Sequence, residues 1–252
     1  MSICSFFLFS LLSMNLIIDN GNSFLKIGLF EQGQFVLSAK YQAQEYEKML
    51  AELKGYSIEA SILSSVAELP QSIDNYISNL PFCLKLNSET PIPIGNNYQT
   101  PLTLGYDRLA NAVGAWEMFK KESVLIIDAG TCLKYDFVDK YGVYQGGAIS
   151  PGLLMRYQSL HHFTDRLPLL LPVGEADLIG SSTTGSIHSG VINGMLGEIK
   201  FIINDYQMNI KPLRVIITGG DAPYFLNKLK TFIFAAPTLT LQGLDSILRY
   251  NQ

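Results

Sequence analysis

Two stretches of the chain share one pattern of apolar and polar positions. Residues 16–21 read Leu-Ile-Ile-Asp-Asn-Gly, and residues 125–130 read Leu-Ile-Ile-Asp-Ala-Gly. Each stretch is followed by a lysine, Lys26 or Lys134. An apolar run that ends in a polar turn predicts a buried strand, and the apolar residues after the turn predict a second strand that runs back antiparallel. The repeat therefore indicates two similar halves, each with a carboxylate at a strand-turn-strand bend.

Apolar residues at helical spacing predict helices as well. A series between residues 109 and 119 predicts one helix, and a series between residues 187 and 202 predicts another over about 183–206. Thr183 or Thr184 is expected to cap the second helix. Strands that alternate with helices in two similar halves predict an α/β protein with a ligand between the halves.

Three small residues in the second predicted helix, Ser186, Gly190 and Gly194, are spaced by four. Such a stripe lets another backbone pack closely, either in the same subunit or in a second one. It is the sequence feature that suggests a subunit contact.

The two Asp-x-Gly bends suggest a chemical role. A single copy is usually a plain turn, because Asp and Gly are ordinary turn residues. Two copies at equivalent places favour a functional bend over a plain turn. A carboxylate beside exposed backbone N–H groups can hold a hydrated divalent metal and cradle phosphates, so two such bends across a cleft can grip a nucleotide. A third apolar run, residues 215–218, leads into Gly219-Gly220, where a ring or ribose can approach the backbone.

Composition and charge narrow the class of protein. The 252 residues are 48% hydrophobic and 16% charged, so the chain is expected to fold rather than to stay disordered. Its net charge is -4 and it has no basic run, which argues against a nucleic-acid partner. Cys4, Cys83 and Cys132 are too far apart to indicate a disulfide scaffold or a zinc site.

Residues 1–13 are largely apolar and look like a short signal-peptide core. However, no Lys or Arg precedes the apolar run, no small-residue cleavage site follows it, and a membrane-spanning helix needs roughly 20 residues. Met14 stands directly before the first predicted strand. We therefore favour a mis-start or a dispensable extension over a true signal, and we expect no membrane partner.

Six segments stand out in order along the chain. They are Asp19–Lys26 (D-x-G-N-T/S-x-x-K), Gly105–Arg108 (G-x-D-R), Asp128–Thr131 (D-x-G-T), Gly146–Gly152 (G-G-x-I-x-P-G), Ile179–Thr183 (I-G-x-x-T) and the Gly219-Gly220 turn. Each alone is a weak signal. Together, at compatible spacing over most of the chain, they resemble the motifs of the type III pantothenate kinases, a family of the actin-like superfamily that also holds acetate and sugar kinases.

This resemblance implies a fold and an activity. The implied fold is two ribonuclease-H-like (actin-like ATPase) domains, residues 14–113 and 114–252, with a nucleotide cleft between them. The implied activity is ATP-dependent phosphorylation of pantothenate to 4'-phosphopantothenate, the first step of coenzyme A biosynthesis. The implied enzyme is a cytoplasmic homodimer that uses Mg2+ and a monovalent cation, K+ or NH4+.

The resemblance also implies a role for each matching residue. Asp107 is the implied general base, and Asp128 is the implied ligand of the monovalent cation. The implied ATP-binding residues are Asp19, Asn20, Gly21, Asn22, Ser23, Phe24, Leu25, Lys26 and Thr131, with Asp19 binding magnesium through water. The implied pantothenate-binding residues are Tyr98, Gly105, Tyr106, Asp107, Arg108 and Thr183.

These residue types suit phosphoryl transfer. Cations neutralise the transferred group while one base accepts the proton of the attacking hydroxyl, and a carboxylate such as Asp107 suits that base. The five donors of Arg108 match a planar carboxylate, and pantothenate carries one. Plainer roles stay open: Asp107 can cap a helix, Arg108 can form a surface ion pair, and Tyr98 can be an exposed loop residue.

Three residues depart from the family pattern. Ser23 stands where threonine is more common, which keeps the hydroxyl. Cys132 and Lys134 stand where small or hydroxylated residues are more usual, and we expect Cys132 to be a small buried residue rather than a reactive thiol. Either Lys134 lies near the cation site and competes with potassium, or it points away.

Two other functions stay open. Members of this family have been described as accessory factors for transcription, which would make the chain a binding protein, and a superfamily kinase can act on another small hydroxy acid or a sugar. Asp19, Lys26, Asp107, Arg108 and Asp128 are all present, and a pure binding protein has no need to keep the base. The Gly-x-Asp-Arg segment with Tyr98 is the feature that separates pantothenate from other substrates.

Overall fold

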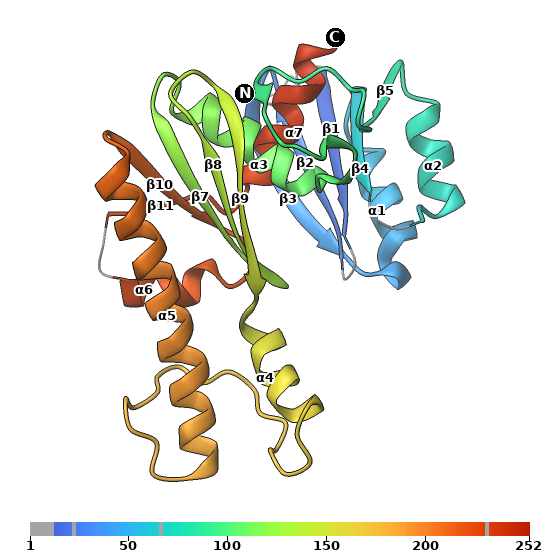
Figure 1. Cartoon of the computed structure of the whole chain (residues 1–252). Coiled ribbons are helices and arrows are strands. Elements are labelled where there is room, and N and C mark those ends of the chain that lie inside the picture. Colours follow the sequence, from blue (N-terminus) through green and yellow to red (C-terminus); the bar gives the residue numbers. More distant parts are fainter. Residues whose placement is uncertain (1–12, 22–23, 66–67, 230–231) are drawn as a thin grey trace, which may run out of the picture. The chain divides into compact units, whose positions relative to one another are not determined.

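The computed structural model of the chain describes residues 13–21, 24–65, 68–229 and 232–252, in two compact units (Figure 1). The first unit holds the described residues up to Pro91 together with Leu244–Gln252, and the second holds Ile92–Gly243. The predicted extension lies almost wholly outside the described residues. The predicted boundary at 113/114 falls inside helix α3 (Tyr106–Met118), because this helix packs against the sheet of the second unit.

The first unit is built on a mixed five-stranded sheet of order β3-β2-β1-β4-β5. Leu16, Ile17 and Ile18 of β1 are fully buried, as expected for a central strand that is covered on both faces. The strands are β1 (Met14–Asn20), β2 (Leu25–Glu31), β3 (Gln34–Tyr41), β4 (Ile58–Ser65) and β5 (Phe82–Lys85). The helices are the 3-10 turn Ala43–Glu45, α1 (Tyr46–Leu53), α2 (Gln71–Ser78) and the end of α7 (Leu239–Tyr250).

The second unit is built on a six-stranded sheet of order β11-β10-β7-β8-β9-β6. The strands are β6 (Gly95–Asn96), β7 (Ser123–Ala129), β8 (Cys132–Val138), β9 (Val143–Pro151), β10 (Leu213–Thr218) and β11 (Phe234–Ala235). The helices are the 3-10 turn Pro101–Thr103, α3, α4 (Leu153–His162), α5 (Thr183–Asn209), α6 (Ala222–Leu229) and the start of α7.

The two sheets repeat one strand order. In the second unit the order β9-β8-β7-β10-β11 reproduces β3-β2-β1-β4-β5 of the first, with β6 added at the β9 edge. Strand β1 pairs antiparallel with β2 and parallel with β4, and β7 pairs in the same way with β8 and β10. This is the order of a ribonuclease-H-like sheet, so the predicted duplication and the α/β fold class are confirmed.

Helix α5 covers one face of the second sheet, and Figure 1 shows it continuing well past the end of that sheet. Its apolar face, which includes Ile187, Met195 and Ile199, packs in one core with residues of β7 and β10. The prediction of a cap at Thr183 or Thr184 is wrong by one residue. Ser182 keeps an extended backbone and its Oγ accepts the Gly185 N–H at 3.0 Å, whereas Thr183 is already helical.

Helix α4 was not predicted from the sequence. It follows β9 directly and lies beside the first turns of α5, joined to that helix by residues 163–182 (Figure 1). Its weak separation of apolar and polar faces explains the omission, since Leu153 and Tyr157 are its only buried residues. Among the described residues, none of the helices has the length and apolar character that crossing a membrane requires.

Candidate active site

Asp128 and Lys134 form a cross-strand pair in the second unit. Asp128 lies near the end of β7, and the antiparallel register sets Lys134 of β8 directly opposite it. Opposed residues on one face of a sheet have Cβ atoms about 5 Å apart, so their side chains meet. Lys134 Nζ lies 2.7 Å from Asp128 Oδ2. Of the two predicted positions for Lys134, the structure therefore selects the one against Asp128.

Helix α3 brings a second carboxylate to the same ammonium. Asp107, in the first turn of α3, accepts a hydrogen bond from Lys134 Nζ at 2.5 Å. One turn later the buried Asn111 donates from Nδ2 to Asp128 Oδ2 at 3.3 Å, and its Oδ1 accepts from Thr240 Oγ1 at 2.8 Å. Residues four apart share a helix face, so α3 presents Asp107 and Asn111 together. Lys134 thus bridges two carboxylates from different elements.

The ion pairs determine the charge of Asp107 and Lys134. Burial favours the neutral carboxyl of Asp107, but the Lys134 ammonium and the Arg108 N–H outweigh it and hold the pKa of Asp107 below its ordinary value. Burial likewise opposes the charge on Lys134, yet Asp128 and Asp107 raise the pKa of Lys134 well above its ordinary value. Both groups are therefore charged at neutral pH.

Arg108 forms a buried ion pair rather than a surface one. It is 5% exposed, and its Nη2 and Nε lie 2.7 Å and 2.9 Å from Asp136 Oδ1 on β8. Tyr144 of β9 donates to the same oxygen at 2.7 Å. Burial raises the pKa of Asp136, and the Arg108 guanidinium and the Tyr144 hydroxyl oppose that rise. The surface ion pair considered for Arg108 is excluded, and the pair anchors the start of α3.

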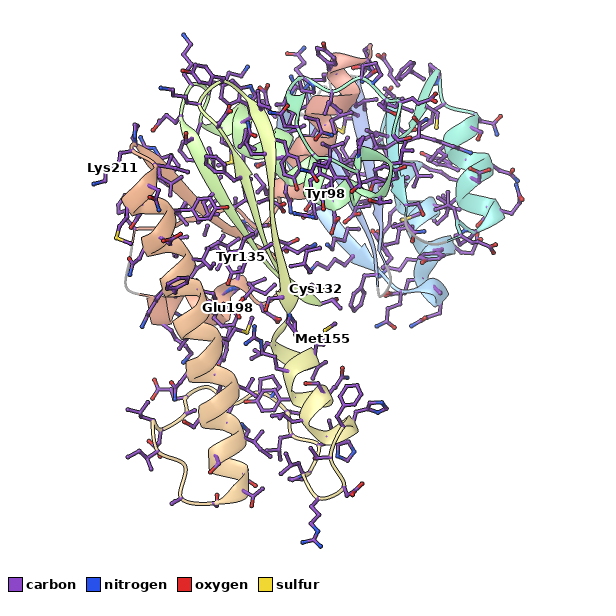
Figure 2. All side chains as sticks on the ribbon, viewed as in Figure 1. Tyr98, Cys132, Tyr135, Met155, Glu198 and Lys211 are labelled. Atoms are coloured by element: carbon purple, nitrogen blue, oxygen red, sulfur yellow. The ribbon has the colours of Figure 1, made fainter. Side chains whose placement is uncertain are left out.

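Tyr98 reaches this group from a connecting loop (Figure 2). Arg108 Nη1 lies 3.4 Å from Tyr98 Oη, and the Tyr98 ring centroid is 6.0 Å from that of Tyr144. Gly146 makes room for it, because it has φ +98° and a Cβ there would lie 3.3 Å from the Tyr98 ring. Tyr98 therefore belongs to the Arg108 cluster and is not an unattached loop residue.

The Gly-Gly turn after β10 closes against the Asp128 bend. Gly219 has φ +95°, and a Cβ at this position would lie 2.2 Å from Ala129 O and 2.6 Å from Asp128 Oδ1. The Asp221 N–H donates to the same Ala129 carbonyl at 2.8 Å. Only glycine fits at position 219, whereas a Cβ at Gly220 would meet open space. The turn thus brings bare backbone beside the carboxylate.

The first unit holds the equivalent bend. The register of β1 and β2 sets Asp19 opposite Lys26, as it sets Asp128 opposite Lys134 in the second unit. Lys26 Nζ lies 3.4 Å from Asp19 Oδ2, with the lysine side chain 42% exposed. Leu25, in contrast, is fully buried in the core of this unit, so its side chain faces away from any ligand. Asn22 and Ser23 lie outside the described residues.

The other predicted residues differ in how far they are exposed. Asn20 is buried and donates from Nδ2 to Ser65 Oγ at 2.9 Å. Phe24, Thr131 and Thr183 are exposed. Gly105 and Tyr106 lie half-buried at the start of α3, and the Gly21 N–H closes the first bend onto the Phe24 carbonyl at 3.2 Å.

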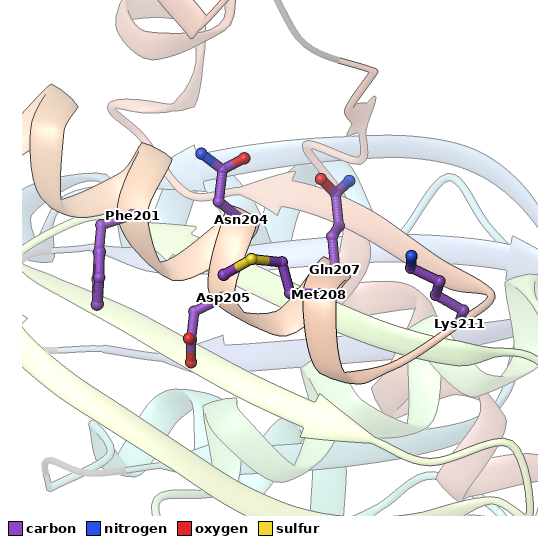
Figure 3. A pocket seen from close by; sticks show the side chains of 6 residues that line it. All are labelled: Phe201, Asn204, Asp205, Gln207, Met208 and Lys211. Atoms are coloured by element: carbon purple, nitrogen blue, oxygen red, sulfur yellow. The ribbon is translucent and has the colours of Figure 1, made fainter.

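Two hollows lie along α5. One of about 650 Å³ lies between α4 and α5 and is lined by Arg156, Leu160, Thr183 and Gly190 among others. The other, of about 590 Å³, lies near the end of α5 and holds none of the predicted site residues (Figure 3). Thr183 is therefore the predicted substrate residue that faces a hollow within its own unit.

Sequence reasoning missed the residues that hold the site residues in place. Asp136 and Asn111 are fully buried polar groups inside apolar elements, and Tyr144 pairs with Asp136. A charged residue in an otherwise apolar strand is the signal that identifies such a group, because a buried charge needs a partner. Another missed pair joins Tyr135 Oη to Glu198 at 3.1 Å, from β8 to α5 (Figure 2).

Comparison with solved structures agrees with the fold. A Campylobacter jejuni protein assigned to the Baf family of transcriptional activators superposes with a TM-score of 0.56 at 19% identity, over 94% of this chain and 98% of its own. A glucokinase from an Antarctic psychrotroph superposes with a TM-score of 0.51 at 10% identity, over 94% and 99%. At these identities the likeness concerns the fold alone.

Comparison of sequences identifies the family. The family model of type III pantothenate kinase matches residues 15–205. The type III pantothenate kinase of Phocaeicola vulgatus is 44% identical over 94% of this chain and 99% of its own length. The corresponding protein of Christiangramia forsetii is 42% identical over 95% and 99%. The motifs, the duplicated fold and these full-length matches agree that the chain belongs to the type III pantothenate kinase family.

Proposed function

We propose that this pantothenate kinase transfers the γ-phosphoryl group of ATP to the pantothenate hydroxyl with Asp107 as general base. The observation that carries the proposal is the position of Asp107. Its side chain is 41% exposed at the start of α3, and its Oδ2 and Oδ1 accept from Lys134 and from the Arg108 N–H. A carboxylate that is ionised, oriented and open to solvent on one side can accept the hydroxyl proton.

Arg108 acts beside the base in this proposal. Its guanidinium is held by Asp136, so its contribution to the substrate is an oriented positive charge together with the fixed start of α3. Tyr98, Gly105 and Tyr106 adjoin this group and are the remaining residues of the second unit that we assign to pantothenate, with Thr183. The preformed cluster keeps the base in place before the substrate binds.

The ATP phosphates are assigned to the bend of the first unit. Lys26 is half-exposed beside Asp19 and can turn its ammonium to a phosphate oxygen. The Asp19 carboxylate at a glycine turn also fits hydrated Mg2+, which prefers hard oxygen ligands and keeps several waters. That ion supplies charge neutralisation on the phosphates when it is bound. Asn20, Gly21, Asn22, Ser23, Phe24 and Thr131 complete the proposed ATP set, and Leu25 can contribute only its backbone, because its side chain is buried in the core.

The monovalent cation that the resemblance implies at Asp128 fits this chain poorly. The Lys134 ammonium already lies 2.7 Å from Asp128 Oδ2, in the direction of Asp107. A second cation at the same oxygen would meet a fixed like charge at short range. No step of the proposed reaction therefore passes through K+ or NH4+.

We also infer that the enzyme works in the cytoplasm, as its family resemblance implies. We further infer that two copies of the chain associate through an arm, which is formed by α4, α5 and the segment between them. Gly190 and Gly194 of the predicted stripe have open space where a Cβ would lie, so no backbone of the described residues packs there. Large apolar side chains of the arm are exposed as well, among them Phe163, Leu171, Leu178 and Ile179. An exposed apolar surface beside a small-residue stripe suits a second copy.

The test of the proposed reaction measures ADP release by the purified protein with ATP, Mg2+ and pantothenate. Asp107→Asn is expected to lower turnover by about 10²- to 10⁴-fold while ATP affinity, measured by calorimetry, stays unchanged. Asp205→Asn, which removes an exposed carboxylate of α5, is the matched control. Full activity of Asp107→Asn would remove Asp107 as the base. Release with a sugar or another hydroxy acid, but none with pantothenate, would favour a different substrate; ATP binding without release would favour a binding protein.

A further inference from the structure

The ammonium of Lys134 takes the place that a free cation would need at Asp128. We propose, on the basis of the kinase function above, that Lys134 is a built-in substitute for the monovalent cation, so that this chain phosphorylates pantothenate without K+ or NH4+. Lys134 acts as a positioning residue, since it contacts Asp107 and Asp128 and orients the base.

The position of Lys134 follows from the sheet and not from a single side-chain conformation. Its Cα is the direct antiparallel partner of Asp128, between the neighbouring pairs Ile127–Tyr135 and Ala129–Leu133. Tyr135 and Leu133 are buried in the core, so the strand cannot slip without moving them. The strand register therefore holds Lys134 opposite Asp128.

Two carboxylates hold the ammonium where one would leave it free to move. Lys134 Nζ lies 2.7 Å from Asp128 Oδ2 and 2.5 Å from Asp107 Oδ2, and its side chain is only 15% exposed. Asn111 Nδ2 also donates to Asp128 Oδ2, at 3.3 Å. An ammonium has three donors, and these two acceptors take two of them.

The equivalent pair in the first unit shows what the second carboxylate adds. Lys26 stands opposite Asp19 as Lys134 stands opposite Asp128, but its Nζ is 3.4 Å from the carboxylate and its side chain is 42% exposed. The lysine of the first unit is thus held more loosely and is suited to a mobile phosphate. The lysine of the second unit is fixed between protein groups, as a structural cation is.

A monovalent cation from solution and the lysine ammonium supply the same charge at this point. K+, NH4+ and the lysine ammonium each carry one positive charge and each can join two carboxylate oxygens. The fixed lysine needs no binding from solution, so its charge is present at any salt concentration. No covalent step is added: the hydroxyl proton still passes to Asp107, and the charge that orients this carboxylate comes from the chain itself.

The first experiment uses the wild-type protein. Pantothenate-dependent ADP release is measured with Tris or tetramethylammonium salts alone, and then with KCl or NH4Cl, at a constant ionic strength of about 0.1 M. The expected change in kcat and KM is less than about twofold, because no site waits for the ion. A wild-type enzyme that works only with K+ or NH4+ would overturn the proposal.

The second experiment removes the lysine ammonium and asks whether a cation from solution can replace it. Lys134→Thr is expected to lose about 10²-fold in kcat without K+ and to regain most of it when K+ or NH4+ is added, since the open carboxylates can then bind the ion. Lys140→Thr, at an exposed lysine of the same unit, is the matched control and is expected to behave as wild type. Lys134→Arg, which keeps the charge, is expected to stay indifferent to K+. A Lys134→Thr enzyme that is fully active without added cation would contradict the proposal.

Thermal unfolding gives a readout that needs no turnover. K+ is expected to raise the Tm of Lys134→Thr but not that of wild type, because an ion that binds only the folded state stabilises it. A rise in the wild-type Tm that is specific to K+ over tetramethylammonium would overturn the proposal even if no ADP release were found. Absence of release in every salt, with normal ATP binding, would instead count against the kinase function.

Discussion

The buried pair of Arg108 and Asp136 makes the stability of the second unit sensitive to one charge. Asp136→Asn keeps the volume of the side chain but removes its charge, and Arg108 is then left at 5% exposure without a counter-ion. The contacts that lose the negative charge of their acceptor are the two from Arg108, at 2.7 Å and 2.9 Å, and the one from Tyr144 at 2.7 Å. Breaking a buried pair from one side costs about 3–5 kcal/mol, so we expect the free energy of unfolding to fall by that amount.

The assay follows urea unfolding through Trp116, the single tryptophan of the chain. Trp116 lies on α3 of the second unit and its ring packs against Gly142, so its fluorescence reports this unit directly. With a slope of about 2–3 kcal/mol per molar urea, the expected loss lowers the transition midpoint by roughly 1–2.5 M. Arg108→Met is expected to cost less in the Asp136→Asn background than in wild type, because no charge is then stranded.

Asp205→Asn serves as the control here too, because this carboxylate is exposed on α5 of the same unit. It is expected to shift the stability by no more than about 0.5 kcal/mol. A comparably small effect of Asp136→Asn, or strict additivity of the two substitutions at Arg108 and Asp136, would contradict the prediction. Either result would mean that the pair is not coupled as its burial requires.

Two further predictions concern glycines. Gly219→Ala is expected to destabilise the second unit by about 1–3 kcal/mol in the Trp116 assay, because the φ of Gly219 is +95° and the new Cβ would meet Ala129 O. Gly220→Ala, where a Cβ meets open space, is the control for stability, and an equal loss of stability in the two variants would contradict the prediction. Gly190→Leu is expected to yield a folded monomer by light scattering, because the site is open within this chain. A dimer that persists in Gly190→Leu would remove α5 from the proposed contact.

The sequence predicted those features that depend on neighbouring residues. The paired runs at 16–21 and 125–130 indicated strand, bend and returning strand, and both sheets are built that way. The apolar spacing after residue 107 indicated the helix that became α3. Hydrophobic periodicity and turn-forming residues act over a few positions, so the sequence alone is enough to predict the strands, bends and helices that depend on them. The motif order likewise indicated the family, which the full-length matches confirmed.

Local sequence signals gave wrong or missing predictions in two situations. In one, two neighbouring residues were similarly suited to the same role; in the other, the feature depends on residues that are distant in the sequence. Ser182 rather than Thr183 caps α5, a difference of one residue between similar hydroxyls. Helix α4 lacks a strong apolar face and was missed. The boundary of the units falls before α3 and again inside α7, because the end of the chain belongs to the first unit. No local sequence pattern shows that Leu244–Gln252 belong with the first unit.

The roles of the charged residues were decided by tertiary structure. Arg108 and Asp136 are 28 residues apart, and only the packing of α3 on β8 makes them a buried pair. The sequence left Lys134 with two possible directions, and the register of β7 and β8 with the approach of α3 selected the one between Asp128 and Asp107. The chain by itself determines which residues can carry charge and where strands turn. Which charges neutralise one another depends on distances of a few ångströms that exist only after the sheet has formed and the helix has packed on it.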